Sequence, residues 1–339
     1  MSPAISEQAS GERLKIHNLV REDARSSFAE DVRAGLSSNP KRLFPKYFYD
    51  ALGSQLFEAI CLLPEYYLTR AENEILARYA DEIVKEVDGD EISLLEMGSG
   101  SASKTRLIIE AILRRQSDLL FIPVDISASA LETSSRVLLQ SYPSLRINAY
   151  ASDYYDGLAA LAQDERRGRT LALFLGSNIG NFDEDEAHAF LRALRQVLSA
   201  GDALLLGADL RKDAQVLEAA YDDSLGITAS FNLNQLARIN RELDADFNLR
   251  AFRHYVTYNK ESGRVEVYIE SLREQWVSIR KLDMKIHFRE GERLHTENSC
   301  KYDLEGLSHL AQETGYRRAH TWLDRQERFS SNLFIAVGQ

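Results

Sequence analysis

The sequence predicts an α/β protein with a doubly wound, mainly parallel, Rossmann-like sheet and a second α+β part that contains antiparallel strands. Three observations lead to this prediction. Between Thr69 and Gly201, short apolar runs alternate with amphipathic segments. After about residue 212 the alternation stops, and strand-like segments follow a helical stretch. From Asp303 onward, one helix and two strands return. Alternation of apolar strands with helices is typical of a parallel sheet covered on both faces.

The first part of the chain is expected to supply most of this sheet. Helical segments are predicted near residues 21–36 and 50–62, and a longer helix begins at Thr69. Three pairs match the capping box that starts a helix: Thr69/Glu72, Ser129/Glu132 and Asp183/Glu186. The predicted strands are 92–96, 121–125, 146–151, 171–175 and 203–206, and the helices between them are 104–115, 128–141 and 183–198.

The second part of the chain is expected to form an antiparallel addition. A helical stretch reaches about Leu243, and residues 259–263 have the composition of a hairpin turn. The predicted strands are 253–259, 264–272, 276–279 and 284–288, followed by a helix over 303–315 and strands over 316–323 and 331–337. We therefore expect a disordered segment over 1–14, a sheet domain over 71–211 plus 297–339, and a second domain over 15–70 plus 212–296.

Composition narrows the class of protein. The length of 339 residues suits two domains, and the net charge of -11 makes nucleic acid an unlikely partner. The only cysteines, Cys61 and Cys300, provide no disulfide framework, and the seven histidines form no metal-binding pattern. Neither a signal peptide nor an apolar run of about 20 residues is present. We expect a soluble, cytoplasmic, monomeric protein without a metal.

The turn after the first predicted strand, Glu96-Met97-Gly98-Ser99-Gly100, indicates a cofactor. Glycines there let the backbone turn sharply and lie close to a ligand. The third glycine of a dinucleotide fingerprint is missing. Asp125 ends the second strand, where an acid accepts ribose hydroxyls, although it could instead cap the next helix. Asp153 and Tyr154 follow the third strand, where they could meet an adenine edge or simply form a turn. Together these positions favour S-adenosylmethionine over a nicotinamide dinucleotide.

Longer motifs make the prediction more specific. From about residue 29 to the end, the chain resembles the histidine N-alpha-methyltransferases of ergothioneine biosynthesis, which are dependent on S-adenosylmethionine. The motifs that carry this resemblance are PKYFYD at 45–50, LPEYYLTR at 63–70, EMGSGSASKTR at 96–106, LGSNIGNF at 175–182, AYDD at 220–223 and TENSCK at 296–301.

The resemblance implies a class I methyltransferase sheet, a separate substrate-binding domain and an amino acid bound between the two. The positions that match the family's cofactor site are Tyr49, Gly98, Lys104, Asp125, Asp153 and Tyr154. The positions that match its substrate site are Tyr66, Gly176, Asn181, Tyr221, Glu297 and Ser299. In that family Asn181 and Tyr221 would hold the substrate carboxylate, whereas Glu297 and Ser299 would hold the imidazole. Tyr49, Asn181 and Tyr221 are the expected catalytic residues.

The residue types at these positions fit that chemistry. Asn181 can donate to a carboxylate, although it could instead belong to a helix N-cap, and the tyrosines could be packing residues. Glu297 and Ser299 are two apart, so in an extended segment both point to one face. A carboxylate there can accept an imidazole N–H, although a lone glutamate is more commonly an exposed acid. The histidine enzymes carry methionine on the hairpin strand where this chain has Val267, which reshapes the expected side-chain pocket.

The expected reaction is methylation of the α-amino group of histidine, up to the trimethylated product hercynine, with S-adenosylhomocysteine as by-product. An α-amino group has a pKa of about 8 in peptides, so orientation matters more than a strong base. Tyr49 and the Gly176 carbonyl would accommodate the quaternary cation. The alternatives are methylation of another aromatic amino acid such as tryptophan, a non-catalytic module that binds S-adenosylmethionine, and a nicotinamide-dependent oxidoreductase.

Overall fold

The structure is a computed structural model that describes residues 13–19, 24–100, 102–162 and 166–338. Of the segment 1–14 that was predicted to be disordered, residues 1–12 lie outside the described residues, whereas Leu14 begins a β-strand, so the prediction is wrong there. The chain divides into two compact units. The sheet unit contains the described residues before position 20, Arg70–Leu210 and the chain from Tyr302 onward. The second unit contains residues 24–69 and Arg211–Lys301.

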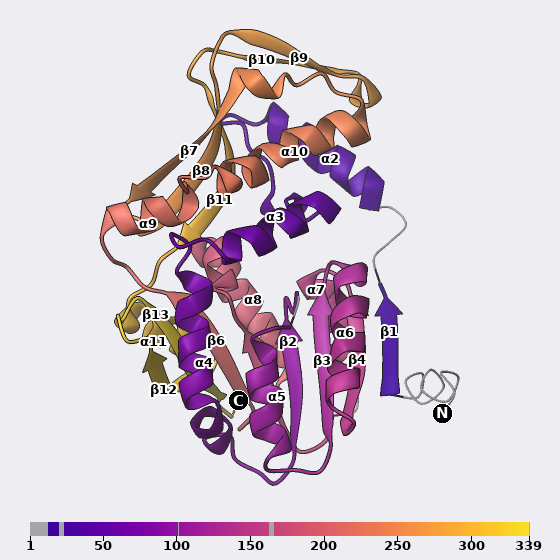
Figure 1. The fold of residues 1–339 in the computed structure, drawn as a ribbon, viewed down its shortest axis with the longest axis vertical. Helices are drawn as coiled ribbons and strands as arrows, with labels where there is room; N and C mark the ends of the chain where they lie inside the picture. The colour runs from indigo at the N-terminus through magenta and orange to yellow at the C-terminus, as the bar shows by residue number, and fades with distance from the viewer. Residues whose placement is uncertain (1–12, 20–23, 101, 163–165, 339) are drawn as a thin grey trace. The chain divides into compact units, whose positions relative to one another are not determined.

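An eight-stranded sheet organises the sheet unit, in the order β1-β4-β3-β2-β5-β6-β13-β12 (Figure 1). All neighbouring strands are parallel except that β13 runs antiparallel to both β6 and β12. The predicted doubly wound, mainly parallel sheet is thereby confirmed. The strands are β1 Leu14–Asn18, β2 Ile92–Met97, β3 Leu119–Asp125, β4 Leu145–Ala151, β5 Arg169–Phe174, β6 Ala203–Asp209, β12 Tyr316–Leu323 and β13 Phe329–Ala336.

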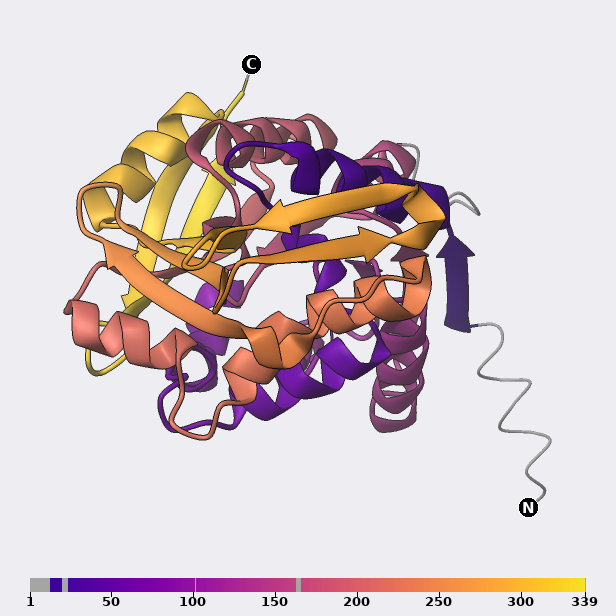
Figure 2. The same cartoon turned by 90° about the horizontal axis from the view of Figure 1, so that it is seen from above.

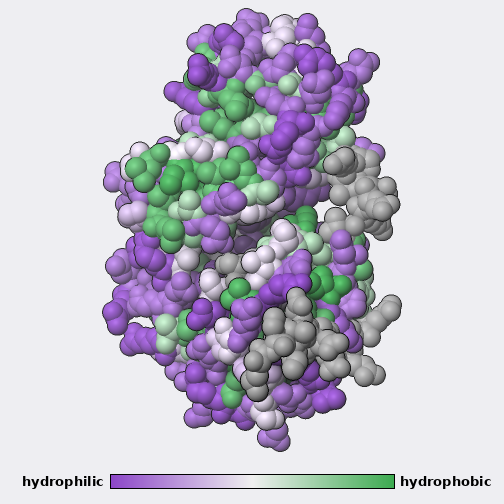
Figure 3. Space-filling model, turned by 45° about the vertical axis from the view of Figure 1, so that its right-hand side comes forward, coloured by the Kyte–Doolittle hydropathy of each residue, from purple (hydrophilic) through white to green (hydrophobic). Residues whose placement is uncertain are grey.

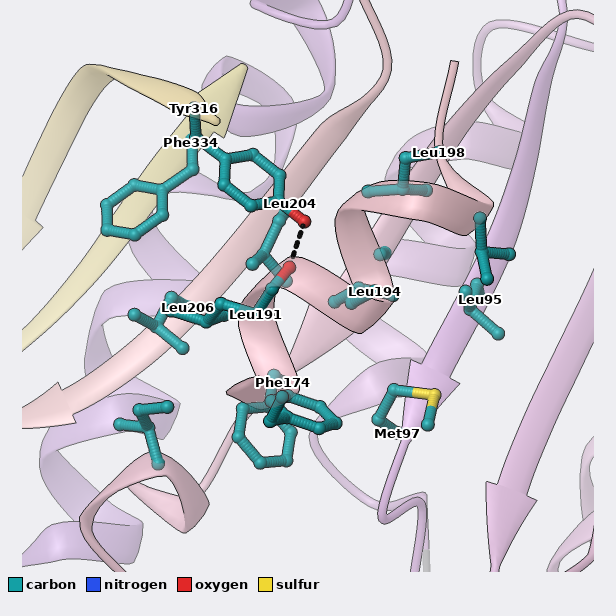
Figure 4. Packing of buried hydrophobic residues seen from close by; sticks show 14 of the residues in the cluster. Leu95, Met97, Phe174, Leu191, Leu194, Leu198, Leu204, Leu206, Tyr316 and Phe334 are labelled. Atoms are coloured by element: carbon teal, nitrogen blue, oxygen red, sulfur yellow. Dashed lines mark hydrogen bonds between the residues drawn. The ribbon is translucent and has the colours of Figure 1, made fainter. Parts of the chain in front are cut away.

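Helices cover both faces of this sheet. On one face α4, α5 and α6 lie side by side, joined by contacts such as those of Arg114 with Asp81 and of Tyr142 with Glu110 (Figure 1). On the other face α7, α8 and α11 pack onto the strands in one apolar cluster, part of which is drawn in Figure 4. The helices are α4 Leu68–Lys85, α5 Thr105–Leu113, α6 Ala128–Ser141, α7 Tyr154–Leu161, α8 Glu184–Val197 and α11 Leu304–Glu313, with a short 3-10 turn η2 Asn178–Asn181 after β5.

The second unit contains a three-stranded antiparallel sheet, β11-β8-β7, and a two-stranded ribbon, β10-β9. Figure 2 shows most of these strands in orange, with α10 alongside, and α10 packs against β7, β8, β9 and α3. A separate apolar core forms between α2, α10 and the strands. The elements are α2 Ala24–Ser37, α3 Ala51–Cys61, α9 Ala214–Tyr221, α10 Ile227–Leu243, β7 Phe252–Asn259, β8 Arg264–Ser271, β9 Gln275–Ile279, β10 Met284–Phe288 and β11 Arg293–Cys300, together with the 3-10 turns η1 Pro45–Tyr47, η3 Leu249–Ala251 and η4 Arg280–Leu282.

Two of the three predicted capping boxes are wrong. Helix α4 begins at Leu68, so Thr69 lies within the helix rather than before it. In α6 the cap is Ser127, whose hydroxyl accepts from the Ala130 N–H at 3.3 Å. The Asp183/Glu186 box is confirmed, because each side chain accepts from the other residue's N–H. Serine, threonine and acidic residues compete for caps within a few positions, so spacing alone does not select the right one.

Other differences arise from tertiary pairing. Residues 15–18, expected with the second domain, belong to β1, which pairs with β4 at the edge of the eight-stranded sheet. Residues 297–300, expected with the sheet domain, belong to β11, which pairs with β8. The single helical stretch predicted up to Leu243 is two helices, since Gly226 adopts a left-handed conformation between α9 and α10.

The surface drawn in Figure 3 is largely hydrophilic, with separate apolar areas. In the described residues, no helix combines the length and apolar character needed to cross a membrane.

Candidate active site

The glycine turn between β2 and α5 is held tightly against its neighbours. Gly98 has φ +76° and donates its N–H to the Val124 carbonyl at 2.8 Å. A Cβ atom on Gly98 would lie 2.9 Å from the Tyr154 Oη and 3.0 Å from the Asn178 Nδ2. Gly98 is therefore required both for its backbone conformation and for the close approach of these side chains.

Glu96 supports this turn from within. Its buried carboxylate accepts from the Ser99 Oγ at 2.8 Å and from the Thr105 Oγ1 at 2.6 Å. Burial raises its pKa to about 7, and the two hydroxyl donors act in the opposite direction. Glu96 thus connects the end of β2 to the start of α5 and braces the turn from inside.

Asp125 lies at the end of β3, next to the glycine turn. Its carboxylate accepts from the Gly100 N–H at 2.8 Å and from the Ser127 N–H at 2.9 Å. Burial raises the pKa of Asp125, while these N–H donors lower it. Because Ser127 caps α6, Asp125 is not needed for that role. A carboxylate has about four acceptor positions, so the Asp125 carboxylate keeps acceptor capacity for a ligand hydroxyl.

Asp153 and Tyr154 have different surroundings. Asp153 caps α7 and accepts from the Asp156 N–H at 2.8 Å. It therefore has the structural role in the turn after β4 that was the alternative to binding adenine. Tyr154 packs its ring against Phe174, Phe182 and Phe190. Burial raises the pKa of Tyr154, and its neutral hydroxyl lies beside Gly98. Tyr154, which follows β4, thereby lies against the glycine turn that follows β2.

Glu72, on α4, joins two predicted site residues, although its place in the site was not predicted from the sequence. Its fully buried carboxylate accepts from the Gly176 N–H at 2.9 Å and forms an ion pair with the Lys104 ammonium. A Cβ atom on Gly207 would lie 2.1 Å from the Glu72 Oε1, so glycine is needed there. Its position on the helical face of Ile75 and Tyr79 was the signal available in the sequence.

Replacing Glu72 with alanine is expected to destabilise the protein by about 3 kcal/mol, because it leaves the Lys104 ammonium and the Gly176 N–H without this partner. Urea denaturation followed by circular dichroism measures the change. The matched control is Asp81→Ala, which removes an ion pair between the same two helices, with side chains 73% and 54% exposed, and should cost less than about 1 kcal/mol. Equal losses would contradict a special role for Glu72.

The turn after β5 carries Gly176 and Asn181. Gly176 has φ +74°, and Ser177 is also left-handed, with its Oγ accepting from the Asp209 N–H at 3.0 Å. Asn181 ends η2 and is half-buried. The N-cap of α8 is Asp183, so Asn181 does not have the capping role that was its alternative.

Within the second unit, four predicted site residues lie in one neighbourhood. The rings of Tyr66 and Tyr221 meet edge to face at 6.1 Å, and burial raises the pKa of Tyr66. The Tyr221 hydroxyl lies 2.7 Å from the Ser299 Oγ. Tyr49 is linked to Tyr66 through Phe57, with ring separations of 5.5 and 6.3 Å.

A buried histidine, also missed from sequence, supports Tyr221. The Asn232 amide donates to the His254 Nδ1 at 2.8 Å, so the His254 Nε2 carries the proton and donates to the Tyr221 carbonyl at 2.7 Å. Burial lowers the pKa of His254, which favours this neutral tautomer. The backbone of Tyr221 is therefore held at the end of α9.

The pairing of β11 with β8 places Glu297 opposite Val267 and Ser299 opposite Val265. A register shift between His295 and Glu297 precedes this pairing. Val267 is buried. Burial raises the pKa of Glu297 to about 7, and the positive charge of Lys301 acts in the opposite direction. The segment from Glu297 to Ser299 is extended, as predicted, and its pairing with β8 places Val267 next to Glu297.

The raised pKa of Glu297 gives a prediction for stability. The unfolded chain releases this proton near pH 4.5 and the folded chain only near pH 7, so ionisation costs folding free energy that appears as pH rises between these values. Glu297→Gln removes that cost. The variant should melt higher than the wild type at pH 8 and equally at pH 4.5, by calorimetry. Glu274→Gln, at a side chain 75% exposed, should show no such difference. A difference of the opposite sign would contradict the burial of this carboxylate.

Among the described residues, no group of three or more His, Cys, Asp or Glu side chains is placed to hold a metal ion.

Comparison with known proteins identifies the family of the chain. The model of the family described as "Histidine-specific methyltransferase, SAM-dependent" matches residues 28–336. Histidine N-alpha-methyltransferase of Mycolicibacterium smegmatis is 41% identical over 94% of this chain and 97% of its own. The enzyme of the same name from Mycobacterium tuberculosis is 41% identical over 95% of this chain and 99% of its own. N-methyltransferase fsqC of Aspergillus fumigatus is 27% identical over 98% of this chain and 90% of its own.

Proposed function

Since the chain belongs to the family of histidine-specific methyltransferases that use S-adenosylmethionine, we propose that it methylates the α-amino group of L-histidine, as in ergothioneine biosynthesis. The product after three transfers is N-alpha,N-alpha,N-alpha-trimethylhistidine, or hercynine. The observation that carries this proposal is the 41% identity to histidine N-alpha-methyltransferases along almost the whole chain. The β11 register, with Glu297 beside the buried Val267, supports it.

For the cofactor, we assign the ribose hydroxyls to Asp125, whose carboxylate keeps acceptor positions beside the glycine turn. Gly98 allows the backbone to approach the ligand. Tyr154 and Asp153 are assigned to the adenine end of the cofactor. Asp153 would contact the adenine in addition to capping α7. Lys104, held by Glu72, and Tyr49 complete the cofactor residues. Bound S-adenosylmethionine supplies a methyl group activated by its sulfonium.

For the substrate, we assign the imidazole to Glu297 and Ser299. The carboxylate accepts an imidazole N–H, and this charge-assisted bond is stronger than a neutral one. The substrate carboxylate is assigned to the Tyr221 hydroxyl and to the Asn181 amide, both of which can donate. Tyr66 and Gly176 are assigned to the same ligand, and Val267 borders the imidazole.

These residues act by orientation. An α-amino group, with a pKa of about 8 in peptides and somewhat higher in a free amino acid, needs only mild deprotonation, so the chain does not need a strongly basic side chain at this position. Holding the substrate at its carboxylate and at its ring fixes the amine lone pair between them, and such positioning accounts for a large part of a rate acceleration. The Tyr49 ring and the Gly176 carbonyl are suited to the quaternary product cation.

The test is a panel of free amino acids incubated with S-adenosylmethionine labelled in its methyl group. Transfer to histidine, with mono-, di- and trimethylated products resolved by mass spectrometry, is the expected result. Transfer to tryptophan but not to histidine would overturn the assignment of the substrate. Tight binding of S-adenosylhomocysteine without turnover on any amino acid would instead indicate a non-catalytic binding module.

Val267 supports a second candidate, methylation of another aromatic amino acid. Its side chain is shorter than the methionine expected at this place and lies opposite Glu297, so it alters the space beside the ring. A Val267→Met variant separates the two candidates. If histidine is the natural substrate, the change leaves histidine turnover within about threefold; a gain of histidine turnover of more than tenfold would favour the second candidate.

A further inference from the structure

Lys301, the residue that follows β11, forms a buried polar cluster with two predicted substrate residues. Only 2% of its surface is exposed. Its ammonium group donates to the Tyr221 Oη at 2.9 Å and to the Ser299 Oγ at 2.9 Å. Those two oxygens lie 2.7 Å apart, so the three polar atoms form a closed triangle.

The backbone of Lys301 is held on both sides. Its N–H donates to the Gly263 carbonyl at 2.7 Å, and its carbonyl accepts from the Arg211 Nε at 3.3 Å. Gly263 has φ +67°, and a Cβ atom there would lie 2.8 Å from the Arg211 Nε. The backbone of Lys301 is therefore fixed against the turn of the β7–β8 hairpin.

The triangle determines where the hydroxyl protons point. An ammonium group only donates, so Tyr221 and Ser299 both accept from Lys301. One hydroxyl then donates to the other. If the bond between the hydroxyls is exchanged for bonds to a ligand, both oxygens still have a donor in Lys301, so neither is left unsatisfied.

The charge of Lys301 matters as well. An ammonium group removed from water is costly and favours a nearby anion. A carboxylate bound to the Tyr221 hydroxyl would lie within about 6 Å of this charge, since each of the two hydrogen bonds spans about 3 Å. Histidine provides such a carboxylate, whereas its decarboxylated analogue histamine keeps the imidazole and the amine but lacks the anion.

We propose that Lys301 is a positioning residue that acts through Tyr221 to select substrates with an α-carboxylate, so that this chain accepts an amino acid and rejects the corresponding amine. This inference rests on the proposed function, in which Tyr221 binds the substrate carboxylate. Lys301 itself makes no contact with the reacting atoms in this scheme.

The experiment is calorimetry of histidine and histamine binding to the full chain in the presence of S-adenosylhomocysteine. For Lys301→Met, histidine affinity should fall about 50-fold and histamine affinity about fivefold, because the Lys301 charge also favours the ionised Glu297 that is assigned to the ring of both ligands. Lys301→Gln keeps N–H donors without the charge, and should lose about tenfold for histidine and about threefold for histamine. If Lys301→Met fails to fold, Lys301→Gln alone is compared with the wild type.

The outcomes separate the two proposals. Histidine binding by the wild type reports on the proposed function, and its absence would overturn both. Wild-type binding, followed by equal losses for histidine and histamine in the variants, would overturn only the role of Lys301, because it would mean a general structural effect. An unchanged histidine affinity would do the same.

Discussion

Replacing Asp125 with alanine is expected to weaken S-adenosylmethionine binding about 100-fold. In the proposed site, its carboxylate accepts from the two ribose hydroxyls, and hydrogen bonds to a charged acceptor contribute about 1.5–3 kcal/mol each. The same change releases the Gly100 and Ser127 N–H groups, which loosens the glycine turn. Calorimetry with S-adenosylhomocysteine measures the loss directly.

Asp118→Ala is the matched control for this prediction. Asp118 immediately precedes β3, at the opposite end from Asp125, and pairs with Arg146 through a side chain that is 46% exposed. Its removal should leave cofactor affinity within twofold. If both variants bind S-adenosylhomocysteine as the wild type does, Asp125 serves only to hold the turn, and the ribose assignment is wrong.

Replacing Glu297 with alanine is expected to lower histidine affinity about 100-fold and to leave S-adenosylhomocysteine affinity unchanged. The imidazole loses a charge-assisted hydrogen bond in a buried setting, where such bonds are strongest. Calorimetry with histidine, in the presence of S-adenosylhomocysteine, gives both numbers. Because burial raises the pKa of Glu297 to about 7, wild-type affinity for histidine should also fall as pH drops from 7 to 5, when the carboxylate gains a proton.

The control is Glu266→Ala. Glu266 lies on β8 next to Val267 but on the opposite face of the strand, where it accepts from the Tyr268 hydroxyl at 2.7 Å. Its removal should change histidine affinity less than threefold. Equal binding of histidine to the wild type and to Glu297→Ala would show that the assigned ring contact does not exist.

The parallel sheet could be predicted because its signals are local. β6, for example, is buried along its whole length, and residues 203–206 form the continuous apolar run that is typical of such strands. The same holds for the turn at Gly98, whose glycines are required by nearby backbone geometry. α7 was not predicted, because its eight residues begin with two tyrosines and include Gly157, a pattern that is weak for a helix.

β11 is a strand that its own composition does not predict. It contains Arg293, Glu297, Asn298 and Ser299, and its strand character comes from pairing with β8 rather than from its own composition. The sequence indicated an extended segment near Glu297 only because two motif residues are spaced by two.

Glu72 and Lys301 could not be placed from sequence for a related reason. Each contacts residues far away in the chain: Glu72 meets Gly176, and Lys301 meets Tyr221. A buried charge looks like any surface charge until its partners are known. Only the occurrence of Glu72 on an apolar helical face pointed to burial.

Strand β13 lies between β6 and β12, and this order has a consequence for folding during synthesis. β6 ends at Asp209, whereas the strand that pairs with its free edge begins at Phe329. During synthesis, the whole segment Arg211–Lys301 leaves the ribosome before β13 does, so the apolar edge of β6 stays unpaired during that interval. Open edges of this kind invite pairing with other chains. Nascent chains that stop before residue 329 should therefore be the species that recruits chaperones.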